Sequence, residues 1–124
     1  MILGIGTDII EIERINQSIE KFGDKFLRKI FTQNEINYCN SKANSSQHFA
    51  ARFAAKEAIS KAIGTGWNHQ FNWLEIEISN LPSGEPIAKL TGKMSSFLSE
   101  NQMLKISMSH SENYATCFAI YFLS

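Results

Sequence analysis

The alanine-rich segment in the middle of the chain constrains the fold more than any other feature. Its periodicity predicts a helix over residues 46–63 that stops at Gly64, since glycine commonly ends helices. At about 100° per residue, one side of this helix is small and apolar, and it carries Ala51, Ala54, Ala55, Ala58, Ile59 and Ala62. The other half carries Arg52, Lys56, Glu57, Ser60 and Lys61. Because alanine side chains are short, we expect this helix to approach a sheet closely.

Apolar runs with a period of two predict strands on both sides of this helix. The first, over residues 2–10, places Gly4, Gly6 and Asp8 on one face, so that Asp8 overlooks a shelf that two glycines clear of side chains. Further strands are expected over residues 73–79, 86–90, 103–109 and 114–122, and further helices over residues 11–30 with a break near Gly23, 33–39 after a Thr32–Glu35 capping box, and 92–100. The last two strands predict an antiparallel hairpin with His110 and Ser111 at its tip. The expected fold class is α+β, with helices packed on a mostly antiparallel sheet.

Size and charge limit the number of domains and the kinds of partner. A chain of 14.0 kDa with 44% hydrophobic residues can bury one ordinary core, so we expect residues 1–124 to form a single domain. Its 12 Lys and Arg balance its 12 Asp and Glu, which gives no general reason to expect nucleic-acid or membrane binding. No apolar run approaches the roughly 20 residues of a membrane-spanning helix. Cys39 and Cys117 lie far apart without metal-ligand neighbours, which favours reduced thiols and a cytoplasmic protein.

Three charged residues in the first strand and the alanine-rich helix are candidates for chemistry. Asp8, in an apolar strand, would cap the next helix, meet a cation or hold a metal. Glu57 and Lys61 are four residues apart, so the plainest interpretation is an ion pair worth about 0.3–0.5 kcal/mol. Two carboxylates facing one open space would also suit Mg²⁺, and a neighbouring lysine would suit a phosphate oxygen or a proton in transfer. His48 and His69 lack metal-ligand spacing and are interpreted as ordinary surface or core residues.

Three segments, in this order and at this spacing, resemble one family of enzymes. They are GIGTDIIEIERI at the N-terminus, FAARFAAKEAISKAIGTG in the middle and SMSHSENYATCFAI near the C-terminus, and NLPSGEP resembles a fourth segment of the family. The chain is similar along its length to the holo-[acyl-carrier-protein] synthases, the small bacterial 4′-phosphopantetheinyl transferases. The resemblance implies Mg²⁺-dependent transfer of 4′-phosphopantetheine from coenzyme A to a serine of apo acyl carrier protein. Adenosine 3′,5′-bisphosphate would leave, and the product would support fatty acid biosynthesis.

The resemblance also implies a role for individual positions. Asp8 and Glu57 match the family's Mg²⁺ ligands, and Lys61 matches the lysine beside the transferred phosphate, so these three are the catalytic candidates. Arg52 matches a basic residue that contacts the nucleotide phosphates of coenzyme A. Gly64 and Gly66 match a turn beside the nucleotide, and His110 and Ser111 match hairpin residues that contact coenzyme A. The family usually has a cationic loop before the middle segment, whereas SKANSSQHF supplies only Lys42 here.

The resemblance further implies a homotrimer with active sites at subunit interfaces, and an acidic carrier protein as partner. If the first helical region passes Gly23 with little distortion, four basic residues lie within about 60° of one another and form a candidate docking stripe: Arg14, Lys21, Lys25 and Arg28. A solvated helix face is the plainer interpretation of this stripe. Two alternative functions stay open: a non-catalytic binding module for an acidic partner helix, and a metal-dependent nucleotide pyrophosphatase with water as acceptor.

Overall fold

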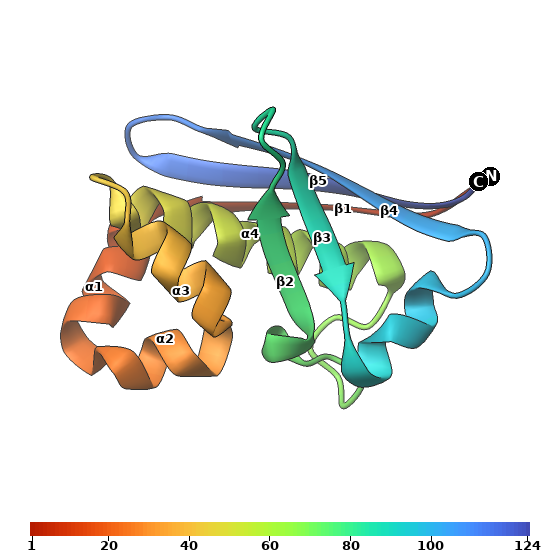
Figure 1. The fold of residues 1–124 in the computed structure, drawn as a ribbon, viewed down its shortest axis with the longest axis horizontal. Helices are drawn as coiled ribbons and strands as arrows, with labels where there is room; N and C mark the ends of the chain where they lie inside the picture. Colours follow the sequence, from red (N-terminus) through yellow and green to blue (C-terminus); the bar gives the residue numbers. More distant parts are fainter.

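The computed structural model describes residues 1–124 and mixes helices with strands along the chain (Figure 1). In chain order the elements are β1 (Ile2–Glu11), α1 (Ile12–Phe22), α2 (Asp24–Ile30), α3 (Gln33–Asn40), α4 (Ser45–Ile63), the 3₁₀ helix η1 (Trp73–Glu75), β2 (Ile76–Asn80), β3 (Pro86–Leu90), the 3₁₀ helix η2 (Gly92–Leu98), β4 (Gln102–His110) and β5 (Tyr114–Leu123). All strand pairings are antiparallel. The expected α+β class is confirmed.

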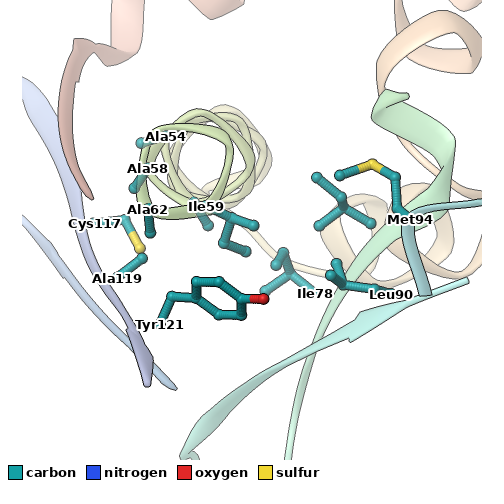
Figure 2. Packing of buried hydrophobic residues seen from close by; sticks show 12 residues of the cluster. Ala54, Ala58, Ile59, Ala62, Ile78, Leu90, Met94, Cys117, Ala119 and Tyr121 are labelled. Atoms are coloured by element: carbon teal, nitrogen blue, oxygen red, sulfur yellow. The ribbon is translucent and has the colours of Figure 1, made fainter. Parts of the chain in front are cut away.

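The strands form two sheets, and α4 lies between them. β5 is the central strand of a three-stranded sheet with β1 and β4, while β2 pairs only with β3. Helices α1, α2 and α3 gather at one end of the molecule (Figure 1). Figure 2 looks along α4: its alanines face Cys117 and Ala119 of β5, and Ile59 lies towards Ile78 of β2. The core therefore forms around α4, which the sequence predicted to approach a sheet.

The contact between β1 and α4 depends on two glycines. A Cβ atom on Gly4 would overlap the carbonyl oxygen of Ala62, and one on Gly6 would overlap that of Ala58. The helix therefore approaches the strand backbone against backbone. The prediction that these glycines clear an open shelf beside Asp8 is wrong, because the backbone of α4 fills that space.

Gly23 separates two helices, which removes the condition for one continuous basic stripe. It adopts φ of 56° and ψ of −136°, a positive-φ conformation that glycine tolerates, and the expected break falls there. Arg14 and Lys21 lie on α1, whereas Lys25 and Arg28 lie on α2. All four side chains are exposed, but the stripe predicted for an undistorted helix is not formed.

Three other segments differ from the sequence prediction for local reasons. Residues 73–75 form a 3₁₀ turn instead of beginning a strand, because the Asn72 side chain accepts a hydrogen bond from the Leu74 N–H at 3.0 Å. Residues 92–98 form a 3₁₀ helix, shorter than the helix expected over 92–100. His110 is the last residue of β4, so of the two residues expected at the hairpin tip only Ser111 enters the turn.

The polar half of α4 is divided between two sides of the molecule. Arg52, Lys56 and Ser60 are buried, whereas Glu57 is half-buried and Lys61 is exposed. Residues four apart lie above one another on a helix, so the first three form one line and the last two form another. All five lie on the half of the helix that the sequence predicted, but α3 and β2 cover the first line and leave the second accessible.

Neither cysteine forms a disulfide, since Cys39 and Cys117 are both free and buried. Cys39 belongs to the cluster of buried residues beneath α1, α2 and α3, and Cys117 belongs to the cluster around α4.

None of the helices combines the length and the hydropathy that crossing a membrane requires.

Candidate active site

The predicted metal ligands meet where β1 contacts α4. The carboxyl groups of Asp8 and Glu57 are close enough for each to affect the ionisation of the other. Lys61 follows one turn later: its Nζ donates to the Thr7 carbonyl oxygen at 2.9 Å and lies 3.4 Å from Asp8 Oδ1. The lysine therefore pairs with Asp8 of β1 and does not form the plain helix ion pair with Glu57. The structure brings together all three residues that were predicted to be catalytic.

Asp8 and Glu57 repel each other when both are ionised. Burial, and then the neighbouring Asp8 carboxylate, raise the pKa of Glu57 to about 7, while the Lys61 ammonium opposes this rise. A divalent cation would relieve the repulsion, and carboxylate oxygens are the ligands that Mg²⁺ prefers. No third His, Cys, Asp or Glu joins the two carboxylates, so the remaining metal ligands would be water and substrate oxygens. The residues present fit a magnesium ion.

Arg52 belongs to a second group of residues, on the other side of α4. Its Nη2 donates to Asn80 Oδ1 at 2.9 Å, and its Cζ lies 4.2 Å from the centre of the Tyr38 ring. Arg52 is only 1% exposed, and its Nε has no hydrogen-bond partner. These residues line a cavity of about 240 Å³ together with His48 and His110. A buried guanidinium with an unused donor beside a cavity suits an anion such as a phosphate.

The chain matches proteins of one family over nearly its whole length. Residues 4–119 match the model of the 4′-phosphopantetheinyl transferase superfamily. The chain belongs to this superfamily. It is 46% identical over 121 residues to the holo-[acyl-carrier-protein] synthase of Protochlamydia amoebophila, with 98% of each chain covered. It is 48% identical over 122 residues to that of Koribacter versatilis, with 97% of this chain and 98% of the relative covered.

Solved structures of such synthases share the fold of this transferase. The crystal structure of the enzyme from Neisseria meningitidis matches with a TM-score of 0.90 and 34% identity, covering 98% of this chain and 99% of the other. The Helicobacter pylori enzyme, solved in complex with coenzyme A, matches with a TM-score of 0.84 and 33% identity, covering 95% and 99%. The fold that the sequence resemblance implied is confirmed.

The two groups of residues join α4 to different strands of the three-stranded sheet in this transferase. Asp8 of β1 is opposite Cys117 of β5, which is opposite Met108 of β4, so Asp8 lies two strands away from β4. His110 ends β4 and lines the cavity that contains Arg52. One chain therefore brings together Asp8, Glu57 and Lys61 at one edge of the sheet, and Arg52 with His110 at the other.

The remaining predicted residues lie in two turns of the transferase. Gly64 ends α4 with φ of 85°, and the N–H of Gly66 donates to the Ser60 carbonyl oxygen at 3.1 Å. The Ser111 N–H donates to the Tyr114 carbonyl oxygen at 2.8 Å, and Ser111 Oγ accepts from the Tyr114 N–H at 3.2 Å. Neither turn lines the cavity beside Arg52 within this chain.

Three cavity residues of the transferase were missed by sequence analysis. Asn80 begins the NLPSGEP segment, and it accepts from Arg52 while its Nδ2 donates to the Gly84 carbonyl oxygen at 3.0 Å. That segment was a signal for Asn80. The Tyr38 and His48 rings lie 5.7 Å apart and come from α3 and α4. No spacing in the sequence marks them, and His48, interpreted as an ordinary residue, lines the cavity.

Proposed function

We propose that this chain is a holo-[acyl-carrier-protein] synthase that transfers 4′-phosphopantetheine from coenzyme A to a serine of apo acyl carrier protein. The serine oxygen bonds to the phosphorus that carries pantetheine, and its proton passes to a water near Asp8 and Glu57 or to Glu57 itself. The bond from that phosphorus to the bridging oxygen breaks, and adenosine 3′,5′-bisphosphate leaves. The observation that carries the proposal is the contact of Asp8, Glu57 and Lys61 in a chain that matches synthases over nearly their full length. The product would serve fatty acid biosynthesis, and two free thiols suit a cytoplasmic location.

Asp8 and Glu57 are the residues that would hold Mg²⁺. The bound ion would supply neutralisation of the charge that develops on the pyrophosphate oxygens during transfer. Lys61, half-exposed beside Asp8, would contact an oxygen of the transferred phosphate. Arg52, whose guanidinium charge lies beside the cavity, would attract a phosphate of the nucleotide. The chain needs no nucleophile of its own, because the attacking hydroxyl belongs to the carrier protein.

The proposed reaction is tested by incubating the protein with coenzyme A and Mg²⁺, with and without apo acyl carrier protein. We expect mass spectrometry to show one added phosphopantetheine group on the carrier, and adenosine 3′,5′-bisphosphate only when the carrier is present. Nucleotide release without carrier would favour the pyrophosphatase alternative. Carrier binding without any product would favour the binding module. Chelation of Mg²⁺ should stop transfer, since two carboxylates would be left repelling each other.

Assembly into a homotrimer with shared sites is supported by the outer face of the three-stranded sheet. This face, opposite α4, exposes apolar side chains from all three strands: Leu3, Ile5, Ile9, Met103, Tyr114 and Phe118. Ile5 is 59% and Ile9 62% exposed, and contiguous exposed apolar residues of this kind mark association surfaces. Interfaces in a cyclic trimer are heterologous, so the Asp8 edge of one subunit would face the His110 and Ser111 hairpin of its neighbour.

The carrier protein is proposed to dock on α1 and α2. Their basic residues Arg14, Lys21, Lys25 and Arg28 are exposed and would attract an acidic carrier. Since the two helices are separate, Arg14→Glu tests α1 and Lys25→Glu tests α2. Each should raise KM for the carrier and leave KM for coenzyme A unchanged. Lys89→Glu on β3 is the control, and an equal rise in carrier KM for all three variants would count against this surface.

A further inference from the structure

Lys56 and Glu35 form an ion pair in the interior for which the proposed reaction has no use. Both side chains are fully buried, and Lys56 Nζ lies 2.7 Å from Glu35 Oε1. Nζ also donates to the carbonyl oxygens of Ile30 at 2.8 Å and Trp73 at 2.9 Å, so each of its three protons has an acceptor. Burying a charge is costly unless the charge is paired and hydrogen-bonded, and this ammonium meets both conditions.

Glu35 extends the network to two further segments. Its Oε2 accepts from the Ile78 N–H of β2 at 2.8 Å, and its Oε1 accepts from the Thr32 N–H at 2.8 Å. Through these bonds one side of α4 is tied to α2, α3, η1 and β2. Lys56 makes more hydrogen bonds to other segments than any other side chain of α4.

On the opposite side of α4 the Lys61 side chain bonds to β1, but the rest of the contact between helix and strand is made by small residues. There Ala58 and Ala62 lie against Gly6 and Gly4, with the two backbones almost in contact. Contacts between such small residues set the distance from helix to strand, but they provide few side chains that interlock and fix an angle about the helix axis. The directed bonds of Lys56 supply that constraint.

The rotation of α4 decides where its site residues point. Lys56 and Glu57 are consecutive, so they lie about 100° apart around the helix axis. We propose that the buried Glu35–Lys56 ion pair is a positioning device for the active site: by fixing the rotation of α4, it directs Glu57 towards Asp8. The same constraint holds Arg52, one turn before Lys56, at its cavity. The inference rests on the proposed function for the role it gives to Glu57.

The test removes both charges and keeps side-chain size. The double variant Glu35→Gln/Lys56→Met leaves no buried charge unpaired, so it should fold with reduced stability. Lys56→Met alone leaves Glu35 unpaired and should be less stable than the double variant. Metal binding is measured without coenzyme A, from the paramagnetic broadening by Mn²⁺ of the Asp8 and Glu57 amide NMR signals. The value of kcat is measured separately, at a temperature where every variant is folded.

We expect the double variant to need about tenfold more Mn²⁺ for half-maximal broadening and to lose about tenfold or more in kcat. The reason is that Glu57 would no longer be directed towards Asp8, so the two carboxylates could not bind one ion together. The control is Ile59→Ala, which removes a fully buried apolar side chain from α4 and leaves the ion pair in place. It should also lower stability, but its Mn²⁺ requirement should stay within about twofold of wild type because helix rotation is retained.

Wild-type Mn²⁺ binding and kcat in the folded double variant would overturn the inference. An equal loss in Ile59→Ala would overturn it as well, since reduced stability would then explain both results. A wild-type protein that binds Mn²⁺ at Asp8 and Glu57 but forms no holo carrier would contradict the proposed reaction instead. In that case the Mn²⁺ comparison would still decide the role of the ion pair.

Discussion

Burial separates the roles of single residues that look alike in the sequence. Arg52, Lys56 and Lys61 are all cations of α4, yet the first two are buried and the third is half-exposed. Lys56 is satisfied by protein acceptors, whereas Arg52 keeps an unused donor beside a cavity and Lys61 lies beside carboxylates. A cation whose donors are all used supports the fold, while one with spare donors can meet a substrate anion.

Removing either carboxylate of the site should abolish transfer. We expect Asp8→Ala and Glu57→Ala each to lower kcat by at least about 100-fold, because one ligand alone would hold the metal poorly. Neither residue occupies an apolar packing position, so the free energy of unfolding should change by less than about 1 kcal/mol. Transfer is measured by mass spectrometry of the carrier, and stability by urea unfolding. The control Glu85→Ala removes an exposed carboxylate elsewhere. Full activity in either site variant would contradict the metal assignment.

Both cysteine thiols should resist modification in the folded protein. Cys39 and Cys117 are at most 1% exposed, and burial raises the pKa of each thiol to about 12. Since the thiolate is the reactive form, almost none of it is present at pH 8. We expect a disulfide reagent to label neither thiol quickly in buffer and both in urea, as read from absorbance. Rapid labelling of one thiol in the native protein would disagree with its placement in the core.

Among the secondary-structure elements, the approach of α4 to β1 decides whether a site exists. Asp8 lies two residues after Gly6, and Glu57 lies one residue before Ala58. The close contact between Gly6 and the Ala58 carbonyl oxygen therefore brings the two carboxylates together. The glycines serve the site through helix packing and not by leaving room for a substrate.

A methyl group on β1 should disrupt this packing. We expect Gly6→Ala to lower the free energy of unfolding by about 3 kcal/mol or more, because its Cβ would overlap backbone of α4, which cannot rotate away. Transfer should fall as well, since Glu57 would be displaced from Asp8. Gly64→Ala is the stability control: it has positive φ but free space around its Cβ, so it should cost about 1–2 kcal/mol. Equal urea midpoints for the two variants would show that the contact is looser than described.

As a whole molecule, one chain holds two groups of candidate site residues at opposite edges of its three-stranded sheet. The cavity beside Arg52 and His110 has a volume of about 240 Å³. Sites that enclose a small molecule usually measure roughly 300–1,000 Å³, so this cavity can hold only part of coenzyme A. In the proposed trimer, the exposed apolar outer face of the sheet would bring the other group of residues from a neighbouring subunit.

Mixing two inactive variants should restore activity if the sites are shared. Asp8→Ala and His110→Ala are prepared separately, shown to be impaired, then unfolded, mixed equally and refolded together. In a heterologous ring, one subunit of each interface supplies Asp8 and its neighbour supplies His110. After equal mixing each of these residues is intact in half of the subunits, so about a quarter of the interfaces should have both. Transfer by the mixture is compared with the mean of the two variants.

The control is a mixture of Asp8→Ala with Glu57→Ala. These two residues come together within one chain, so every subunit in that mixture lacks one of them. No interface in that mixture has both residues intact, so activity should stay at the mean of the two variants. Activity no higher than the mean in the Asp8 and His110 mixture would refute the shared site, whatever the oligomeric state found by light scattering.

Local signals made the elements around the site predictable. The period of two over residues 2–10, the glycine stop at Gly64 and the capping box at Thr32 each depend on residues close in sequence, and each is found in the structure. The division of the strands into two sheets was not predicted, because strand pairing depends on which faces α4 covers. The basic stripe failed at Gly23, where one backbone angle redirects the chain.

The sequence by itself predicted that Asp8, Glu57 and Lys61 come together, because Glu57 and Lys61 lie one helical turn apart and the family resemblance adds Asp8. Only the tertiary structure decided the surroundings of the other cations of α4, placing Arg52 with His110 and burying Lys56 in a closed network. The physical reason is that helical periodicity fixes angles around a single element. Desolvation and hydrogen bonding, which decide what a charge can do, depend on the elements that pack against it.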